Sequence, residues 1–475
     1  MTLINSFFNS ALFWAAWVVI PFIMEIIPSL LSAAVLIYKL IHPKKYKDPG
    51  LWPEITLIIP VYNSQDSLEN CIRSIDESTY PNDKIKVYFV ENQGQDDSFG
   101  VYTRCQNEYP ELMMQWLNSK QGKSRALNLA LFNSDGKYII HVDSDGQFEK
   151  HAITNLVRKF ESDVTIDCMT GAILTEPSMI EGYKGFFAKL LRRAEFMEYA
   201  QAFLAGRNAA EFTNSIYTLS GAFSAFRKSA VLKSHLYDTD TICEDTNITF
   251  QMRYIQNVKI HICENAIFFV DPIENFNKLY TQRQRWQRGS LEVSHQFAGK
   301  RLTAVKMFTD VAVRTLMYDH TFAFPRIIWY LALICLTAVG YSANLIFIST
   351  AILYALYIVA GTLYYFSNLG YLGEFEDLKK YYRKHYGIVF ILPLFNMLVF
   401  FIRFAGIINS INTDSAWKTN TLTDERKKFH QELVREISGP AKVIRAMKKW
   451  VNNAQEEPAM VRERRRRRKQ VEKNG

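Results

Sequence analysis

The chain has 475 residues, a net charge of +9 and a hydrophobic fraction of 48%, with 33 Phe and 25 Tyr. Its mean hydropathy of -0.09 is too low for an all-membrane transporter, so a water-exposed domain must be joined to membrane segments. The six cysteines show no CxxC pair and no metal-ligand spacing, which is typical of scattered buried thiols in a reducing compartment.

The N-terminal part of the chain predicts a membrane segment. An apolar stretch runs from about Leu12 to Ile41 and is long enough to cross a bilayer of roughly 30 Å. Lysines at positions 39 to 47 follow it, which places the downstream chain in the cytoplasm and argues against a cleaved signal peptide. We expect residues 1–48 to form this segment, either as one tilted helix or divided at Pro28.

A water-exposed α/β domain is expected over residues 52–300. Short apolar runs at Ile55–Pro60, Ile85–Val90 and Tyr138–Val142 predict buried strands, and helical patterns alternate with them. This alternation is typical of a mostly parallel sheet with helices on its faces.

Apolar runs return in the region that we assign to transmembrane or interfacial helices, residues 327–411. Runs at 327–348 and 351–366 are almost contiguous and predict a helical hairpin, and the basic loop at 379–384 predicts a cytoplasmic side. Residues 301–326 mix polar and apolar side chains, so interfacial helices are expected there.

The third apolar run, residues 388–411, leaves two arrangements open. If it spans the membrane, the basic tail at 412–475 lies outside, against the positive-inside rule; an interfacial segment keeps the tail in the cytoplasm. Pro393 and Arg403 favour the interfacial arrangement. The tail is expected to be solvated, with attraction to anionic lipids as the alternative and no binding of nucleic acid.

Two carboxylates follow the predicted strand Tyr138–Val142. Asp143 and Asp145 are spaced i, i+2 at a strand end, where α/β sheets bind ligands. Converging carboxylates repel each other, and a hard cation such as Mg²⁺ or Mn²⁺, held together with substrate phosphates, offsets this repulsion. The alternative is a plain turn, since Asp-Ser-Asp-Gly also has good turn chemistry.

The sequence Gly122-Lys123-Ser124-Arg125 follows a short predicted strand and opens a helix. A helix N-terminus with a glycine and a lysine suits anionic groups, although the glycine spacing of a P-loop is absent. The alternative is an ordinary helix start with solvent-facing cations.

Adjacent carboxylates, Glu244 and Asp245, begin another helical pattern. Acidic residues there can simply favour the helix dipole. One of them could instead act as a general base that takes the proton from an attacking hydroxyl. His141 and His320 are weaker candidates, because we expect the first in a strand core and the second at the membrane interface.

Gln282, Arg285 and Trp286 fall on one face of a predicted helix by their i, i+3, i+4 spacing. A guanidinium suits the oxygens of a pyrophosphate, and an indole suits the apolar face of a sugar ring. The alternative is a basic helix lying beneath the membrane headgroups.

In this order and spacing, the segments resemble the family 2 membrane glycosyltransferases, which include the cellulose, hyaluronan, chitin and poly-N-acetylglucosamine synthases. The resemblance covers about Thr56 to Gly289, and a narrower likeness is to a Gram-positive group associated with exosortase clusters. It rests on Ile59-Pro60-Val61-Tyr62-Asn63, Gly122 to Asn128, Asp143-Ser144-Asp145, Ser220-Gly221-Ala222, Glu244-Asp245 and Gln282-Arg283-Gln284-Arg285-Trp286.

The resemblance implies a glycosyltransferase-A (Rossmann-like) α/β fold, an inverting mechanism and a nucleotide-sugar donor such as a UDP-sugar. It also implies site residues: Asp143 and Asp145 for the metal ion and diphosphate, Asp245 with Glu244 beside it for the base, Lys123, Gln282 and Arg285 for the donor, and Trp286 for the acceptor sugar.

One segment departs from the family pattern. The family has an Asp that holds the nucleobase after the second strand, whereas this chain has Val90-Glu91-Asn92 there. Glu91 would take that place, and its longer side chain leaves the contact with the uracil open.

We therefore expect a multi-pass enzyme of the cytoplasmic membrane, in contact with lipids, whose cytoplasmic domain elongates a polysaccharide on a glycan or lipid-linked acceptor. Two alternatives remain: transfer of a single sugar to a lipid-linked acceptor, and a catalytically idle membrane scaffold. The intact set of Asp143, Asp145, Asp245 and Trp286 argues against the scaffold.

Overall fold

The computed structural model describes residues 18–19, 21–299, 303–317, 323–338, 342–412, 421 and 423–425. The chain falls into two units, Met1–Trp417 and Lys418–Gly475, and only Thr421 and residues 423–425 of the second are described. The expectations for the apolar residues from Leu12 to Trp17, for His320 and for most of the basic tail therefore lie outside the described residues.

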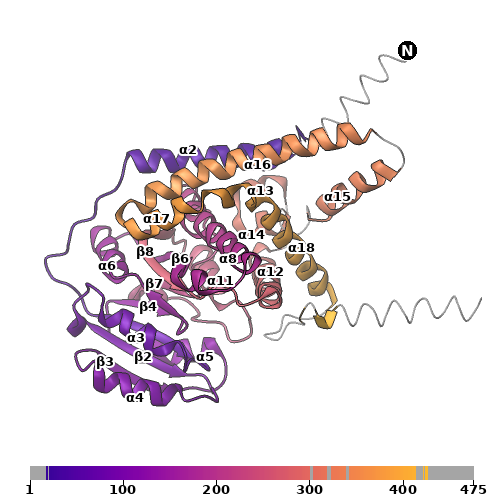
Figure 1. The fold of residues 1–475 in the computed structure, drawn as a ribbon. Coiled ribbons are helices and arrows are strands. Elements are labelled where there is room, and N and C mark those ends of the chain that lie inside the picture. Colours follow the sequence, from indigo (N-terminus) through magenta and orange to yellow (C-terminus); the bar gives the residue numbers. More distant parts are fainter. Residues whose placement is uncertain are drawn as a thin grey trace, which may run out of the picture. The chain divides into compact units, whose positions relative to one another are not determined.

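An eight-stranded mixed sheet forms the core of the water-exposed domain, in the order β3-β2-β1-β4-β7-β6-β8-β5 (Figure 1). The first four strands along the chain pair in parallel, and β7 runs antiparallel to both of its neighbours. The strands are β1 (Ile55–Val61), β2 (Ile85–Glu91), β3 (Met113–Asn118), β4 (Tyr138–Val142), β5 (Gly146–Phe148), β6 (Cys168–Thr175), β7 (Phe223–Arg227) and β8 (Ile260–Val270). The predicted strands and the mostly parallel α/β arrangement are confirmed.

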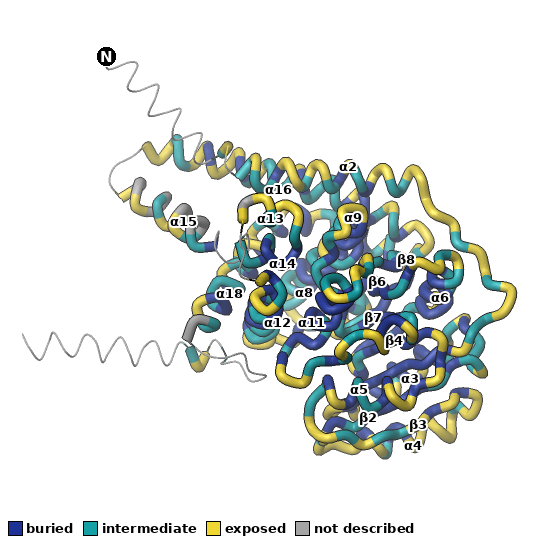
Figure 2. Tube along the Cα trace, turned by 180° about the vertical axis from the view of Figure 1, so that it is seen from behind, coloured by how far each residue is buried: buried dark blue, intermediate teal, exposed yellow. Residues whose placement is uncertain are grey.

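The central strands are buried on both faces, which explains their continuous apolar runs. Along β1, Leu57 and Ile59 join the core on one face, and Ile58 joins the core on the other. Figure 2 shows these strands as a buried layer. Helices α3 (Leu68–Asp76), α4 (Ser98–Glu108) and α6 (Ala152–Ser162) pack on the first face, and α5 (Lys123–Asn133) and α11 (Glu244–Phe250) on the second.

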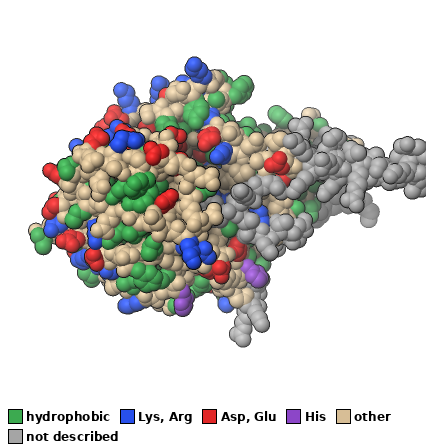
Figure 3. Space-filling view, turned by 90° about the horizontal axis from the view of Figure 1, so that it is seen from below, with side chains coloured by type: hydrophobic (Ala, Val, Ile, Leu, Met, Phe, Trp, Pro, Cys, Tyr) green, Lys and Arg blue, Asp and Glu red, His purple; other side chains and the backbone are tan. Residues whose placement is uncertain are grey.

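Further helices surround the carboxyl ends of the strands or join them. A continuous helical segment is built from α8 (Phe186–Tyr199), the π-helix η4 (Ala200–Gly206) and α9 (Arg207–Phe212), and the long α12 (Phe276–Ala298) packs against α18. The others are η3 (Asn82–Lys84), α7 (Pro177–Gly182), α10 (Lys228–Val231), η5 (Gln251–Ile255), α13 (Ala304–Thr309) and α14 (Val311–Arg314). Acidic, basic and small hydrophobic patches are interspersed on the face in Figure 3, as on water-exposed surfaces.

Three stretches of the described helices are long and apolar enough to cross a membrane: Phe22–Ile41, Ala343–Glu374 and Leu392–Ser410. They contain η2 (Phe22–Ile26) with α2 (Ile27–Ile41), α16 (Ala343–Tyr371) with η7 (Leu372–Glu374), and most of α18 (Leu392–Asn412). The apolar α15 (Ala323–Ala338) precedes α16, and α17 (Glu376–Lys384) and η8 (Tyr386–Phe390) connect η7 to α18.

The N-terminal helix is continuous through Pro28. The π-helix η2 runs directly into α2, and Pro28 lies in the first turn of α2. The wider π-helical turn lies where the proline ring would otherwise clash with the preceding turn, so the residue does not divide the described helix.

The predicted division between the hairpin helices is wrong. The helix α16 begins at Ala343 and runs unbroken past residue 350, whereas α15 ends at Ala338. Ser342 is the N-cap of α16, and serine is a favoured N-cap residue and a poorer helix former than the apolar residues that we placed on both sides of the break.

The structure gives both residues behind the interfacial expectation for the third run a local explanation, and whether α18 spans the membrane or lies at its interface stays a prediction. Pro393 lies in the first turn of α18, where a missing N–H costs nothing. Arg403 Nε donates to Gln287 Oε1 on α12 at 2.6 Å, so this side chain faces the domain. The helix α18 is one of the candidate spans, and the side of the membrane that the tail occupies stays a prediction.

Five cysteines are buried without disulfide partners, as predicted, but Cys335 on α15 is exposed. Its position on an apolar helix explains the difference, because such a helix turns part of its surface away from the protein.

Candidate active site

A cavity of about 450 Å³ lies where the carboxyl end of β4 meets α11 and α12. All the predicted site residues except Glu91 line this cavity: Lys123, Asp143, Asp145, Glu244, Asp245, Gln282, Arg285 and Trp286. The structure thus brings together side chains that are spread over more than half of the domain's sequence.

The turn after β4, which carries both aspartates, is held by hydrogen bonds of the Ser144 side chain and of the Asp143 backbone N–H. Ser144 is buried, and its Oγ lies 2.6 Å from Ser64 Oγ in the loop after β1. The Asp143 N–H donates to the carbonyl oxygen of Ala222 at 3.2 Å. These contacts fix the turn and leave both carboxylates lining the cavity, so the turn interpretation is confirmed and the role of the two carboxylates in a site stays a prediction.

Lys123 at the start of α5 is not a solvent-facing cation. Its Nζ lies 2.5 Å from Asp143 Oδ1 and 3.4 Å from Glu244 Oε1, and it donates to the Gly221 carbonyl oxygen at 3.4 Å. Burial works to lower the pKa of Lys123, but Asp143 and Glu244 outweigh it and raise the pKa, so the ammonium persists. Arg125, by contrast, is exposed, as expected of an ordinary helix start.

The carboxylates Glu244 and Asp245 begin α11 inside the cavity. Asp245 accepts hydrogen bonds from the backbone N–H of Gly221 at 3.2 Å and of Thr246 at 2.7 Å. Burial raises the pKa of both carboxyl groups, and Lys123 opposes the rise. A fixed carboxylate whose pKa is raised is a stronger base and is suited to accept a proton.

Asp145 has the chemistry of a metal ligand that needs further oxygen ligands. Burial, with Asp143 adding to it, raises the pKa of Asp145 to about 6. Within the described part of the chain, no ion pair reaches this carboxylate and no three His, Cys, Asp or Glu side chains cluster as a complete metal site. Asp143 and Asp145 therefore fit a divalent cation whose remaining ligands come from a substrate such as a diphosphate.

The helix α12 supplies the opposite wall of the cavity. Its N-cap is Asn275, whose Oδ1 accepts from the Lys278 N–H at 3.0 Å. The predicted face with Gln282, Arg285 and Trp286 lines the cavity. Sequence spacing therefore placed these three side chains correctly.

Gly289 allows α12 to approach the residues that precede α11. A Cβ at this position would lie 2.0 Å from Cys243 Sγ and 2.8 Å from Cys243 Cβ. We predict that Gly289→Ala destabilises the domain by about 1–3 kcal/mol through overpacking, measured as a lower melting temperature. Gly50→Ala is the control, since nothing lies within 4 Å of a Cβ there, and equal melting temperatures would contradict the prediction.

Sequence reasoning missed several residues that line the cavity. Arg207 is buried, its Nη1 donates to Thr170 Oγ1 at 2.9 Å, and burial lowers its pKa to about 10 while Asp245 opposes that shift. Glu198 and Arg283 form an ion pair in the same cavity. Arg283 lies inside the Gln-Arg-Gln-Arg-Trp motif and could have been singled out, whereas nothing in the sequence marks Glu198 or Arg207.

Glu91 lies at the end of β2, paired with Val61 of β1 and Asn118 of β3, and does not line the cavity. The adjacent Asn92 is buried, and its Oδ1 accepts from the Gly122 N–H at 2.5 Å. Asn92 thereby holds the loop that leads to Lys123, and a contact between Glu91 and a nucleobase stays a prediction.

Residues 56–233 match the model of the family described as Glycosyl transferase family 2. This part of the chain is therefore similar to the catalytic domain of family 2 glycosyltransferases. The match includes Glu91, Lys123, Asp143 and Asp145, whereas Asp245 and the residues of α12 lie beyond its end.

Curated relatives agree with this assignment. The chain is 24% identical over 239 residues to a poly-beta-1,6-N-acetyl-D-glucosamine synthase of Staphylococcus aureus, which covers 50% of the chain and 55% of that protein. It is 23% identical over 292 residues to the synthase of Staphylococcus epidermidis, covering 60% of the chain and 66% of the relative. The chain thus matches about half to two thirds of these relatives' length.

The solved structure of the mannosyltransferase PcManGT from Pyrobaculum calidifontis, in complex with GDP-Man and Mn²⁺, shares the fold. The TM-score is 0.52 at 16% identity, and the likeness covers 80% of this chain and 96% of that one. The predicted glycosyltransferase-A-like fold is therefore confirmed.

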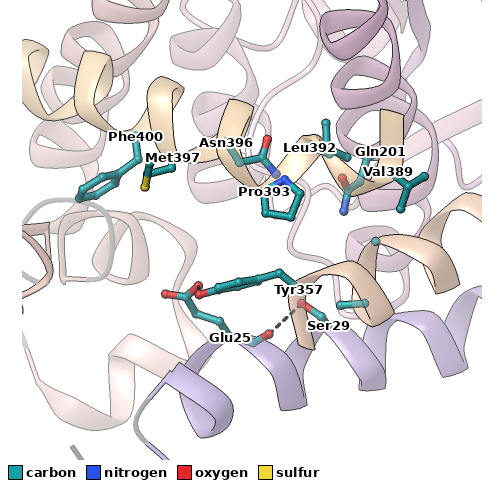
Figure 4. Close-up of a pocket in the computed structure, with 12 residues that line it drawn as sticks. Glu25, Ser29, Gln201, Tyr357, Val389, Leu392, Pro393, Asn396, Met397 and Phe400 are labelled. Carbon is teal, nitrogen blue, oxygen red and sulfur yellow. Dashed lines mark hydrogen bonds between the residues drawn. The ribbon is translucent and has the colours of Figure 1, made fainter. Parts of the chain in front are cut away.

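A second cavity, of about 270 Å³, lies between α2, α16, α18 and η4. Figure 4 shows Glu25 and Tyr357 side by side, with Asn396 and Gln201 on the opposite wall. Tyr357 Oη donates to Glu25 Oε2, and Ser29 Oγ donates to the Glu25 carbonyl oxygen at 2.7 Å. The α/β domain is therefore adjoined by a cavity of mixed polar and apolar lining that is walled largely by candidate membrane spans.

Proposed function

We propose that this chain is an inverting glycosyltransferase that transfers a sugar from a UDP-sugar to a growing polysaccharide at the cytoplasmic face of the cell membrane. The observation that carries the proposal is one cavity that joins Lys123, the aspartates after β4, the carboxylates of α11 and the cationic and aromatic side chains of α12. Cations for a diphosphate, a base and an aromatic platform are the parts that such a transfer needs.

In the proposed reaction, Asp245 accepts the proton of the acceptor hydroxyl as its oxygen attacks the anomeric carbon from the side opposite the diphosphate. The bond between that carbon and the diphosphate oxygen breaks, and the diphosphate leaves with the bonding electrons, so the configuration inverts. Lys123 and Arg285 stabilise the charge that develops on the leaving group. A divalent cation held by Asp143 and Asp145 would supply further charge stabilisation, and the Mn²⁺ of the mannosyltransferase complex supports testing for one.

The donor and product are inferred from the relatives' names. Those relatives are poly-beta-1,6-N-acetyl-D-glucosamine synthases, so UDP-N-acetylglucosamine is the first donor to test and a polysaccharide is the first product. The cavity between the candidate spans, which Glu25, Gln201 and Asn396 line with polar groups, supports a product that continues into the membrane. Release of UDP from a panel of UDP-sugars by the purified protein, together with the length of the product, tests the proposal; a single added sugar would indicate the non-processive alternative.

We predict that Trp286→Ala raises the acceptor KM and shortens the product, while donor binding and slow donor hydrolysis persist. An aromatic face gains about 0.5–1.5 kcal/mol from a stacked ring beyond its buried area, so at least a several-fold loss of acceptor affinity is expected. Arg285→Ala is the contrasting variant, because it should lower kcat by weakening stabilisation of the leaving diphosphate.

Hydrolysis and transfer are measured side by side in both variants. If Trp286 serves only as a headgroup anchor, both activities fall together in Trp286→Ala, and the acceptor-platform role is excluded.

A further inference from the structure

A buried ion pair stands beside Trp286 in the catalytic cavity. Arg283 Nη2 lies 2.5 Å from Glu198 Oε2, and the two side chains keep only 6% and 18% of their surface exposed. Glu198 comes from α8 and Arg283 from α12, so the pair joins helices that are distant in the sequence. Neither residue has a part in the proposed proton transfer or in binding the diphosphate.

The guanidinium of Arg283 also lies over the indole of Trp286. Its Cζ is 4.6 Å from the centroid of that ring and 5.4 Å from the centroid of the Tyr199 ring. A cation over an aromatic face is attracted by the ring, most strongly where water is excluded. Arg283 and Trp286 are three residues apart on one helix, so their side chains are neighbours on its surface.

Glu198 is the carboxylate that pairs directly with this guanidinium, and Tyr199 and Glu195 add to the attraction. A buried guanidinium without a carboxylate is costly, so its position follows the position of Glu198. Burial raises the pKa of Glu198, and Arg283 and Arg403 oppose that rise. Because Arg403 belongs to the candidate span α18, three helices meet around this one carboxylate.

We propose that Glu198 and Arg283 are positioning residues of the acceptor site, which hold the indole of Trp286 in the orientation that an incoming sugar ring needs. This rests on the proposed function, in which Trp286 carries the acceptor. With one face of the indole covered by the guanidinium, the remaining face is the one that receives the apolar face of a neutral sugar ring.

The first test compares Glu198→Gln with the wild-type protein, with UDP-N-acetylglucosamine as donor and a β-1,6-linked N-acetylglucosamine oligosaccharide as acceptor. Loss of the Glu198–Arg283 ion pair should raise the acceptor KM by about five- to twenty-fold, while kcat and donor hydrolysis stay within about two-fold. The matched control is Glu274→Gln, an exposed carboxylate just before α12 that lies 3.9 Å from Lys278 Nζ, which should change none of these values.

A second readout does not depend on activity. In protein labelled with 5-fluorotryptophan, the Trp286 fluorine resonance is identified by its loss in Trp286→Phe. Glu198→Gln should shift or broaden this resonance, and Arg283→Lys, which keeps a cation beside both partners, should shift it less and keep an acceptor KM near the wild-type value. If Glu198→Gln does not fold, Arg283→Met replaces it, with Arg283→Lys again as the rescuing variant.

If the fluorine resonance is unchanged in Glu198→Gln, or if donor hydrolysis and transfer fall together in this variant, Glu198 and Arg283 do not position Trp286 and the proposal is overturned. A wild-type protein that neither hydrolyses the donor nor elongates the acceptor overturns the proposed function instead, and the fluorine signal still decides whether Glu198 and Arg283 order the indole.

Discussion

Asp245→Asn is expected to lower sugar transfer by about 10²- to 10⁴-fold, the usual contribution of a general base, while donor binding persists. The carboxylate is held by the N–H groups of Gly221 and Thr246, and an asparagine keeps the shape and one acceptor oxygen but cannot take up the proton. The loss should appear in kcat, because a base acts in the chemical step. Calorimetric binding of the UDP-sugar and the initial rate of transfer measure the two quantities.

A surface carboxylate from the loop that precedes α11 serves as the control for Asp245→Asn. Asp240 is exposed, and Asp240→Asn should leave both binding and transfer unchanged. Near-normal turnover of Asp245→Asn would contradict the prediction and indicate that Glu244 is the base. Glu244→Gln would then be expected to be the inactive variant.

Removal of divalent cations is expected to abolish transfer, and added Mg²⁺ or Mn²⁺ should restore it. The carboxylates Asp143 and Asp145 repel each other, and the pKa of Asp145 is raised to about 6 by burial first and by Asp143 second. Below that pH the carboxyl group of Asp145 is protonated and binds a cation poorly. The metal concentration that gives half of the maximal transfer rate should therefore rise as the pH falls below about 6. Full turnover in excess chelator would contradict the prediction.

The same pKa gives a stability test that needs no substrate. A raised pKa means that the fold disfavours the ionised form of Asp145, so this carboxylate destabilises the metal-free protein at pH values above about 6. In acid, below the pKa of an aspartate in the unfolded chain, the side chain is protonated in both states and has no such effect. Asp145→Asn should therefore raise the melting temperature in chelator at pH 8 and change it little in acid, whereas with metal present at pH 8 this advantage should shrink. If Asp145→Asn instead melts at a lower temperature than the wild-type protein at pH 8 without metal, the role of this aspartate is purely structural.

Local patterns were enough to predict the elements that carry the site. Apolar runs predicted β1, β2 and β4, because strands buried on both faces leave no polar alternation. A glycine followed by a lysine predicted the start of α5, and i, i+3, i+4 spacing placed Gln282, Arg285 and Trp286 on one face of α12. These features depend on residues close together in the chain.

The partners of a side chain could not be predicted in the same way. Arg403 within an apolar run favoured an interfacial segment, which stays a prediction, and only the structure shows that this side chain bonds to Gln287 of α12, a residue more than a hundred positions earlier. The break between α15 and α16 was misplaced, because nearly continuous hydropathy carries little information about where a helix ends.

The sequence by itself determined the α/β class, the strand-end aspartates and the order of motifs that indicates a family 2 glycosyltransferase. Only the tertiary structure decided that Lys123 is paired with Asp143 and Glu244, and that Glu198 reaches across from α8 to Arg283 beside Trp286. The physical reason is that an ion pair between distant segments needs only one complementary charge at each end. Many residues of a charged chain could supply it, and packing of the helices around the sheet selects the pair that forms.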